Sequence, residues 1–212
     1  MFERMLEDVD PRVAAILEAA LDGREISVEE AECLLRAEGA DRHALYWAAD
    51  KARKEDVGDD VTYVVCRNIN FTNICYVGCS FCGFARHKHD SDAFVHDTDK
   101  LLEKCADAIE RGATEICMQG GIHPQKDHAY YHEIASAVKS AFPQLHLHAF
   151  SPEEIDFGHR KSDMEIGDYL AWLKEAGVSS LPGTAAEILD DEIRDILSPR
   201  KLKTDRWVEI IK

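Results

Sequence analysis

The 212-residue sequence lacks any run of eighteen or more apolar residues, so it offers no candidate transmembrane helix. Its first residues, Met1-Phe2-Glu3-Arg4, lack the basic start and apolar core of a signal peptide. Basic residues are scarce, since 25 lysines and arginines stand against 41 aspartates and glutamates, a formal net charge of −16. This charge would repel a nucleic-acid backbone. We therefore expect a cytoplasmic protein that acts on small molecules and binds neither nucleic acid nor membranes.

The sequence also lacks a second cluster of cysteines. Cys75, Cys79 and Cys82 follow one another at C-x3-C-x2-C spacing, and the other four of the seven cysteines are scattered. Thiols of a protein without an export signal stay reduced, which favours metal binding over disulfides. A four-iron cluster normally takes four thiolates, so three thiolates would leave one iron with an open position. An open position distinguishes a reactive metal site from a structural one.

A structural zinc site is the alternative interpretation of these cysteines. Three cysteines within eight residues could bind zinc together with a nearby histidine, His87 or His89. Zinc sites more often contain two separated C-x2-C units, and this sequence has one. The spacing therefore favours an iron–sulfur cluster, with a zinc-braced α/β binding protein without turnover as the alternative.

Residues 1–58 carry three helical patterns. Asp10-Pro11 supplies an N-cap followed by proline at the first helical position, and Ser27 to Glu30 matches a capping box. A third pattern runs from Ala44 to Ala52 and ends before Gly58. The sequence predicts an N-terminal helical extension with a structural role.

From residue 59 the pattern changes to alternating strands and helices. Residues 61–65, 115–119, 145–150 and 178–181 are predicted to form strands, and helical patterns separate them. This order implies parallel strands joined by right-handed crossovers. We therefore predict an α/β fold in which the sheet curls toward a barrel, with the chemistry at the carboxyl ends of the strands.

The cysteine motif, with Phe81 before its last cysteine, resembles the signature of the radical S-adenosylmethionine (radical SAM) superfamily. The resemblance implies a 4Fe-4S cluster on the three cysteines, S-adenosylmethionine (SAM) on the open iron, and a 5'-deoxyadenosyl radical released after one-electron reduction. It also implies that Phe81 lies beside the adenine and that Gln119, Gly120 and Gly121 contact the amino group of SAM. An ordinary turn after a strand is the alternative for these glycines.

The partial barrel of this superfamily resembles six strands and six helices, whereas four strands are predicted here. The final residues fall inside an apparent helix with Thr204 as its N-cap. We therefore expect residues 59–212 to form a radical SAM core, a (βα)6 barrel truncated after about four strands. The missing C-terminal part is expected to carry some of the adenosyl and substrate contacts.

Three further parts of the sequence resemble the tyrosine-using enzymes of the FO synthase family. These parts are residues 68–79, residues 118–124, and residues 146–152 together with residues 182–189. The resemblance implies transfer of the 4-hydroxybenzyl group of L-tyrosine to 5-amino-6-(D-ribitylamino)uracil, in the biosynthesis of the deazaflavin FO and coenzyme F-420. An electron donor and a second FO synthase subunit would be partners. Radical SAM enzymes of the futalosine route to menaquinone share several of these features and are the alternative.

Three residues are candidates for binding substrate. His146 and His148 share one face of the predicted strand 145–150 and could hydrogen-bond a substrate or carry a proton. Glu187 follows the fourth predicted strand and could bind the tyrosine amine or a uracil N–H. The alternatives are satisfied core histidines and a solvated loop glutamate.

Overall fold

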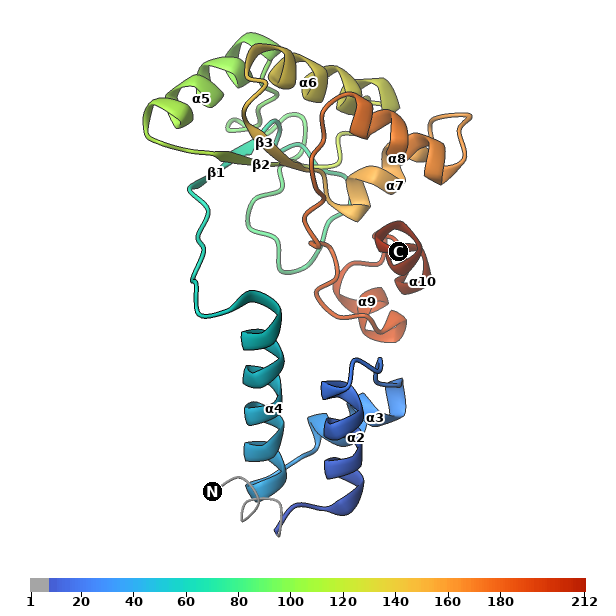
Figure 1. Cartoon of the computed structure of the whole chain (residues 1–212). Coiled ribbons are helices and arrows are strands. Elements are labelled where there is room, and N and C mark those ends of the chain that lie inside the picture. The colour runs from blue at the N-terminus through green and yellow to red at the C-terminus, as the bar shows by residue number, and fades with distance from the viewer. Residues whose placement is uncertain (1–7) are drawn as a thin grey trace. The chain divides into compact units, whose positions relative to one another are not determined.

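The computed structural model describes residues 8–212 and divides into two compact units, the first ending at Tyr63 and the second beginning at Val64 (Figure 1). The described helices of the first unit are α2 (Pro11–Leu21), α3 (Val28–Leu35) and α4 (Gly39–Val57). The two caps predicted in this unit are confirmed, whereas the predicted N-cap Thr204 is the first residue of a later helix whose N-cap is Lys203. Asp10 accepts the backbone N–H of Arg12, and Ser27 and Glu30 form a reciprocal capping box.

Buried side chains of α2, α3 and α4, among them Val13, Ile16 and Ala44, form a separate small core in the first unit. None of the helices in the described part of the chain combines the length and apolar character needed to cross a lipid bilayer.

The second unit is built on a three-stranded parallel sheet in the order β1-β2-β3. The strands are β1 (Cys66–Asn70), β2 (Glu115–Gln119) and β3 (His146–Ala149). The helices that follow them are α5 (Thr98–Glu110), α6 (His128–Ala141), α7 (Pro152–His159), α8 (Ile166–Glu175), α9 (Asp191–Leu197) and α10 (Thr204–Ile211). Figure 1 shows α5 and α6 on the same side of the sheet. The predicted parallel α/β order is confirmed.

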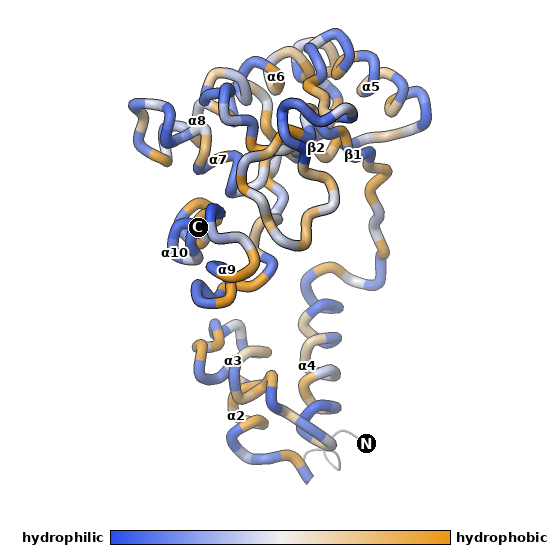
Figure 2. Tube along the Cα trace, turned by 180° about the vertical axis from the view of Figure 1, so that it is seen from behind, coloured by the Kyte–Doolittle hydropathy of each residue, from blue (hydrophilic) through white to orange (hydrophobic). Residues whose placement is uncertain are grey.

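The two faces of the sheet differ in character because side chains alternate along each strand. One face is mostly buried and apolar, with Ile69, Ile116, Met118, Leu147 and Ala149, and Arg67 at its edge forms an ion pair with Asp107 of α5. The opposite face is polar. Toward the carboxyl ends of the strands it consists of Asn68, Asn70, Cys117, Gln119 and His148. Figure 2 shows hydrophilic and hydrophobic residues alternating along the helices, as expected for helices with one buried face.

Two predicted strands are corrected by the structure. Residues 61–65 form no strand, and Val61 and Tyr63 are 92% and 87% exposed, although this stretch contains three valines. Figure 2 shows hydrophobic and hydrophilic residues mixed in the segment between α4 and β1. The first strand lies directly after residues 61–65, because residues 66–70 are the ones that pair with β2. The predicted strand 178–181 is reduced to a single parallel bridge between His148 and Ser180.

Arg194 on α9 organises the region that follows this bridge. Its side chain is 2% exposed and donates hydrogen bonds to four backbone carbonyl groups, those of Ala185, Ala186, Ile188 and Leu202. A buried guanidinium supplies five donors in a fixed geometry, so one side chain can hold two loops together. Arg194 thereby fixes residues 185–188 against residue 202.

We expect Arg194→Ala to lower the free energy of unfolding by about 2–4 kcal/mol, because several buried carbonyl groups lose their donor at once. Urea titration of the two proteins measures this difference. Arg111→Ala is the matched control, because the Arg111 side chain is 76% exposed and forms a surface ion pair with Asp107 one turn earlier. Equal midpoints for wild type and Arg194→Ala would contradict the assigned role.

Candidate functional site

The three predicted cysteine ligands lie on the long loop between β1 and α5. Asn73 ties the two ends of this loop together, because its side chain donates to the carbonyl of Asp92 at 2.9 Å and accepts the N–H of Phe94 at 2.7 Å. Arg86 forms an ion pair with Asp92 at 2.8 Å. These contacts close the loop around the cysteines.

A glycine turn at the end of β2 holds the loop from one side. The backbone N–H of Gly121 donates to the carbonyl of Thr72 at 2.8 Å, and the N–H of Tyr76 donates to the carbonyl of Ile122 at 3.2 Å. A Cβ atom at Gly121 would overlap the carbonyl group of Ile74. Glycine is therefore required here by the close approach of two backbones.

The end of α9 and the residues that follow it contact the cysteine loop from another side. The N–H of Ser80 donates to the carbonyl of Leu197 at 2.8 Å, and Arg200 Nε donates to the carbonyl of Val77 at 3.1 Å. Gly78 has a positive φ of 69° and lies against the guanidinium of Arg200. This left-handed conformation favours glycine.

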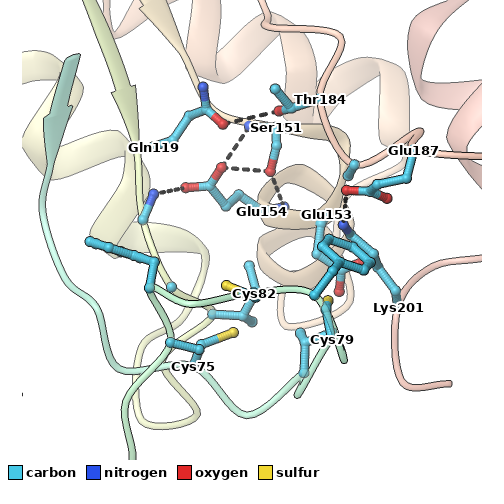
Figure 3. Close-up of a pocket in the computed structure, with 18 residues that line it drawn as sticks. Cys75, Cys79, Cys82, Gln119, Ser151, Glu153, Glu154, Thr184, Glu187 and Lys201 are labelled. Carbon is cyan, nitrogen blue, oxygen red and sulfur yellow. Dashed lines mark hydrogen bonds and ion pairs between the residues drawn. The ribbon is translucent and has the colours of Figure 1, made fainter. Parts of the chain in front are cut away.

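The three cysteines line one cavity of about 230 Å³ (Figure 3). Cys75 and Cys79 are half-buried, and Cys82 is exposed. Figure 3 shows the cysteines on one side of the cavity and Gln119, Ser151 and Glu154 on the other. Within residues 8–212, no group of three Cys, His, Asp or Glu side chains converges as a single metal ion would require.

The donor set fits an iron–sulfur cluster. Three thiols that line one side of a cavity suit a cluster of several irons, whereas a zinc ion needs ligands that converge on one point. His87 and His89 are not among the residues that line this cavity. Burial raises the pKa of the Cys79 thiol, while the positive charge of Lys201 opposes that rise and favours the thiolate that binds metal.

The other predicted site residues fall into two groups. Phe81, Gln119, Gly120, Gly121 and Glu187 line the same cavity as the cysteines. The carboxylate of Glu187 forms an ion pair with Lys201 at 2.6 Å.

The predicted substrate residues His146 and His148 do not line this cavity. They lie on the polar face of β3, and both contact the hydroxyl of Ser180, His146 through Nε2 at 2.8 Å and His148 through Nδ1 at 2.6 Å. A role for them in binding substrate stays a prediction.

The sequence analysis missed two glutamates in the first turn of α7, Glu153 and Glu154. Both are buried and line the cavity. Glu154 accepts the N–H of Gly120 at 2.9 Å, the N–H of Ser151 at 2.7 Å and the hydroxyl of Ser151 at 2.6 Å. The sequence Ser151-Pro152-Glu153-Glu154 is a capping box, which is the signal that could have located this turn.

Burial raises the pKa of Glu154 from 4.5 to about 7, against the opposing effect of its hydrogen bonds. The folded protein therefore keeps a proton that the unfolded chain loses between these two pH values. The contribution of Glu154 to the free energy of unfolding is present below pH 4.5 and falls as the pH rises to about 7.

Glu154→Gln cannot titrate and should remove this part of the pH dependence. The free energy of unfolding of the wild type, relative to the variant, should fall by at most about 3 kcal/mol across that window. Urea titrations of both proteins at several pH values measure the difference. A difference that stays constant with pH would contradict the raised pKa.

The family model of the radical SAM superfamily matches residues 69–212, which include every residue that lines the cavity. Relatives named 5-amino-6-(D-ribitylamino)uracil--L-tyrosine 4-hydroxyphenyl transferase include one from Nostoc sp. strain PCC 7120, 51% identical over 94% of this chain and 52% of the relative. Another, from Methanothermobacter thermautotrophicus, is 45% identical over 97% of this chain and 56% of the relative.

FO synthase of Streptomyces coelicolor is 49% identical over 97% of this chain and 24% of its own length. The chain thus spans about half the length of the transferases and about a quarter of FO synthase.

Solved structures show the same fold at low sequence identity. The FeFe-hydrogenase maturase of Carboxydothermus hydrogenoformans has a TM-score of 0.63 at 19% identity, over 93% of this chain and 46% of that chain. Methylornithine synthase has a TM-score of 0.63 at 20% identity, over 92% of this chain and 54% of that chain. Because the family model covers more than half of its residues, the chain belongs to the radical SAM superfamily.

Proposed function

We propose that this chain provides the radical SAM core of a transferase that moves the 4-hydroxybenzyl group of L-tyrosine to 5-amino-6-(D-ribitylamino)uracil in deazaflavin biosynthesis. The observation that carries the proposal is the arrangement of three thiols and a glycine turn around one cavity (Figure 3). Relatives that are 45–51% identical and carry the name of this transferase support the choice of substrates. An electron donor and a second FO synthase subunit are proposed partners.

Cys75, Cys79 and Cys82 are proposed to hold a 4Fe-4S cluster through three thiolates, which leaves one iron for the methionine part of SAM. When bound, the cluster and SAM would supply the one-electron chemistry that removes a hydrogen atom from tyrosine. The positive charge of Lys201 lies close enough to act on the Cys79 thiol. Charges next to the ligand sulfurs tune the potential of a cluster, so Lys201 is proposed to favour its reduced state.

The remaining residues are proposed to bind ligands and to exclude water. Val77, Phe81, Phe84 and Ile122 give the cavity apolar walls. An apolar lining that excludes water protects reactive species from solvent and holds the reactants in contact. Phe81 is proposed to lie beside the adenine of SAM.

Backbone groups of Gln119-Gly120-Gly121 are proposed to contact the amino group of SAM. The hydroxyl of Thr184 donates to Oε1 of Gln119 at 3.0 Å and orients its side chain. The N–H groups of Gly120 and Gly121 are bonded to Glu154 and to the carbonyl of Thr72, so the carbonyl groups of the turn are the proposed contacts.

Glu187 is proposed to bind the tyrosine amine or a uracil N–H, for which it would exchange its ion pair with Lys201. His146 and His148 are proposed to hydrogen-bond substrate on the polar face of the sheet. Gln119 belongs both to this face and to the cavity wall, so the two regions are continuous.

The experiment that tests the function is anaerobic loading of the protein with iron and sulfide, followed by incubation with reductant, SAM, tyrosine and the aminouracil. Mass spectrometry should detect 5'-deoxyadenosine together with a 4-hydroxybenzyl adduct of the uracil. Formation of 5'-deoxyadenosine without the adduct would contradict the transferase and favour a substrate of the futalosine route. A colourless protein that takes up zinc in place of iron would contradict the radical mechanism.

Replacing any one of Cys75, Cys79 or Cys82 by alanine should reduce iron uptake to background and abolish turnover, because a cluster with two thiolates is held too weakly. Iron and sulfide analysis after reconstitution measures the loss. Cys33→Ala is the matched control, since Cys33 is a half-buried thiol of the first unit. Full iron content in all three loop variants would overturn the ligand assignment.

A further inference from the structure

Glu153 has a buried carboxylate oxygen without a partner. Its side chain is 3% exposed, and Oε2 accepts the backbone N–H of Leu202 at 2.7 Å. Oε1 has no hydrogen-bond donor within the described part of the chain. Buried polar atoms are nearly always satisfied, because an unpaired one loses its hydration without compensation. The free oxygen therefore needs a donor that residues 8–212 do not supply.

The position of Glu153 indicates where that donor comes from. Glu153 lines the cavity that contains the three thiols (Figure 3). Its neighbour Glu154 also lines the cavity, but both oxygens of Glu154 already accept hydrogen bonds, Oε1 from the N–H of Gly120 and Oε2 from the N–H and hydroxyl of Ser151. A ligand that enters the cavity can therefore add a donor to Glu153 but not readily to Glu154.

The charges around the cavity favour a cationic donor. Its charged wall residues are Glu153, Glu154, Glu187 and Lys201, and the lysine is already paired with Glu187. Burial and the nearby charge of Asp156 raise the pKa of Glu153, whereas the N–H of Leu202 and the charges of Lys201 and Arg160 favour its ionised form, as a cationic ligand would. An ionised carboxylate can only accept hydrogen bonds, and a buried one is stabilised most by a partner of opposite charge.

We propose that Oε1 of Glu153 accepts a hydrogen bond from the α-ammonium group of an amino-acid ligand bound in this cavity. SAM and tyrosine both carry this group, and the inference rests on the proposed function for the presence of these two ligands. The glycine turn offers only neutral backbone groups to the same region. Glu153 therefore supplies the negative charge that the turn lacks.

Glu153→Gln tests the inference with little change in structure. The amide oxygen of glutamine can still accept the N–H of Leu202, and the amide NH₂ then occupies the place of Oε1. The substitution thus replaces an acceptor by a donor at the position that faces the ligand. Glu165→Gln is the control, since Glu165 is an exposed glutamate at the start of another helix, α8, and its side chain makes no capping bond.

The measurement is equilibrium dialysis of the iron-loaded wild type and both variants against SAM and, separately, against tyrosine. We expect Glu153→Gln to raise the Kd of one of these ligands about 10- to 100-fold, the loss expected for a charge-assisted hydrogen bond. The ligand that loses affinity identifies the source of the ammonium group. Glu165→Gln should leave both Kd values unchanged.

A third ligand, 5'-methylthioadenosine, contains the adenosine of SAM without its amino-acid part. Its affinity should be the same for wild type and Glu153→Gln, and an equal loss would assign the oxygen to a ribose hydroxyl and overturn the inference. The urea midpoint and iron content of Glu153→Gln should match the wild type. Unchanged Kd values for both SAM and tyrosine would show that Glu153 only anchors Leu202.

The inference about Glu153 and the proposed function can fail independently of each other, because one is tested by ligand binding and the other by product formation. If Glu153→Gln weakens SAM binding but the wild type forms no uracil adduct, the inference stands and the proposed function fails. If the wild type forms the adduct and the variant binds both amino-acid ligands as tightly, the function stands and the inference fails. A wild type that binds neither ligand would overturn the inference.

Discussion

The close backbone approach between the glycine turn and the cysteine loop is the constraint on which the site depends. Gly121 lies so near the carbonyl of Ile74 that no side chain fits between them, and two backbone hydrogen bonds join the segments. The turn ends β2 and the cysteine loop follows β1, so the parallel pairing of these strands brings both to the same end of the sheet. The long loop needs such anchors to hold its thiols around one cavity.

Charge is the second element that organises the site. A cavity lined by three glutamates and one lysine suits a ligand with positive charge, and SAM carries both a sulfonium and an ammonium group. The same lysine acts on the Cys79 thiol and pairs with Glu187, so it links the cluster side of the cavity to the proposed substrate side. Leu202 and Arg194 hold this lysine segment in place through contacts with Glu153 and with residues 185–188.

The sequence predicted features that depend on residues close together in the chain. It missed features that depend on contacts between residues far apart in the chain. The cysteine motif, the helix caps and the parallel order are local patterns, and the structure has the order and the Asp10 and Ser27 caps as predicted, whereas Lys203 and not Thr204 is the N-cap of α10. Residues 61–65 have strong β-propensity, yet the strand lies at residues 66–70, since pairing with β2 decides its position. Glu153 and Glu154 read as an ordinary helix start because their burial depends on Leu202 and Gly120, far away in the sequence.

Electron paramagnetic resonance of the reduced, iron-loaded protein with and without SAM tests the central claim most directly. Three thiolate ligands leave one iron open, so SAM should bind that iron and change the spectrum. The account predicts a four-iron signal that shifts when SAM is added. A four-iron signal that is identical in both samples would contradict an open position at this cluster.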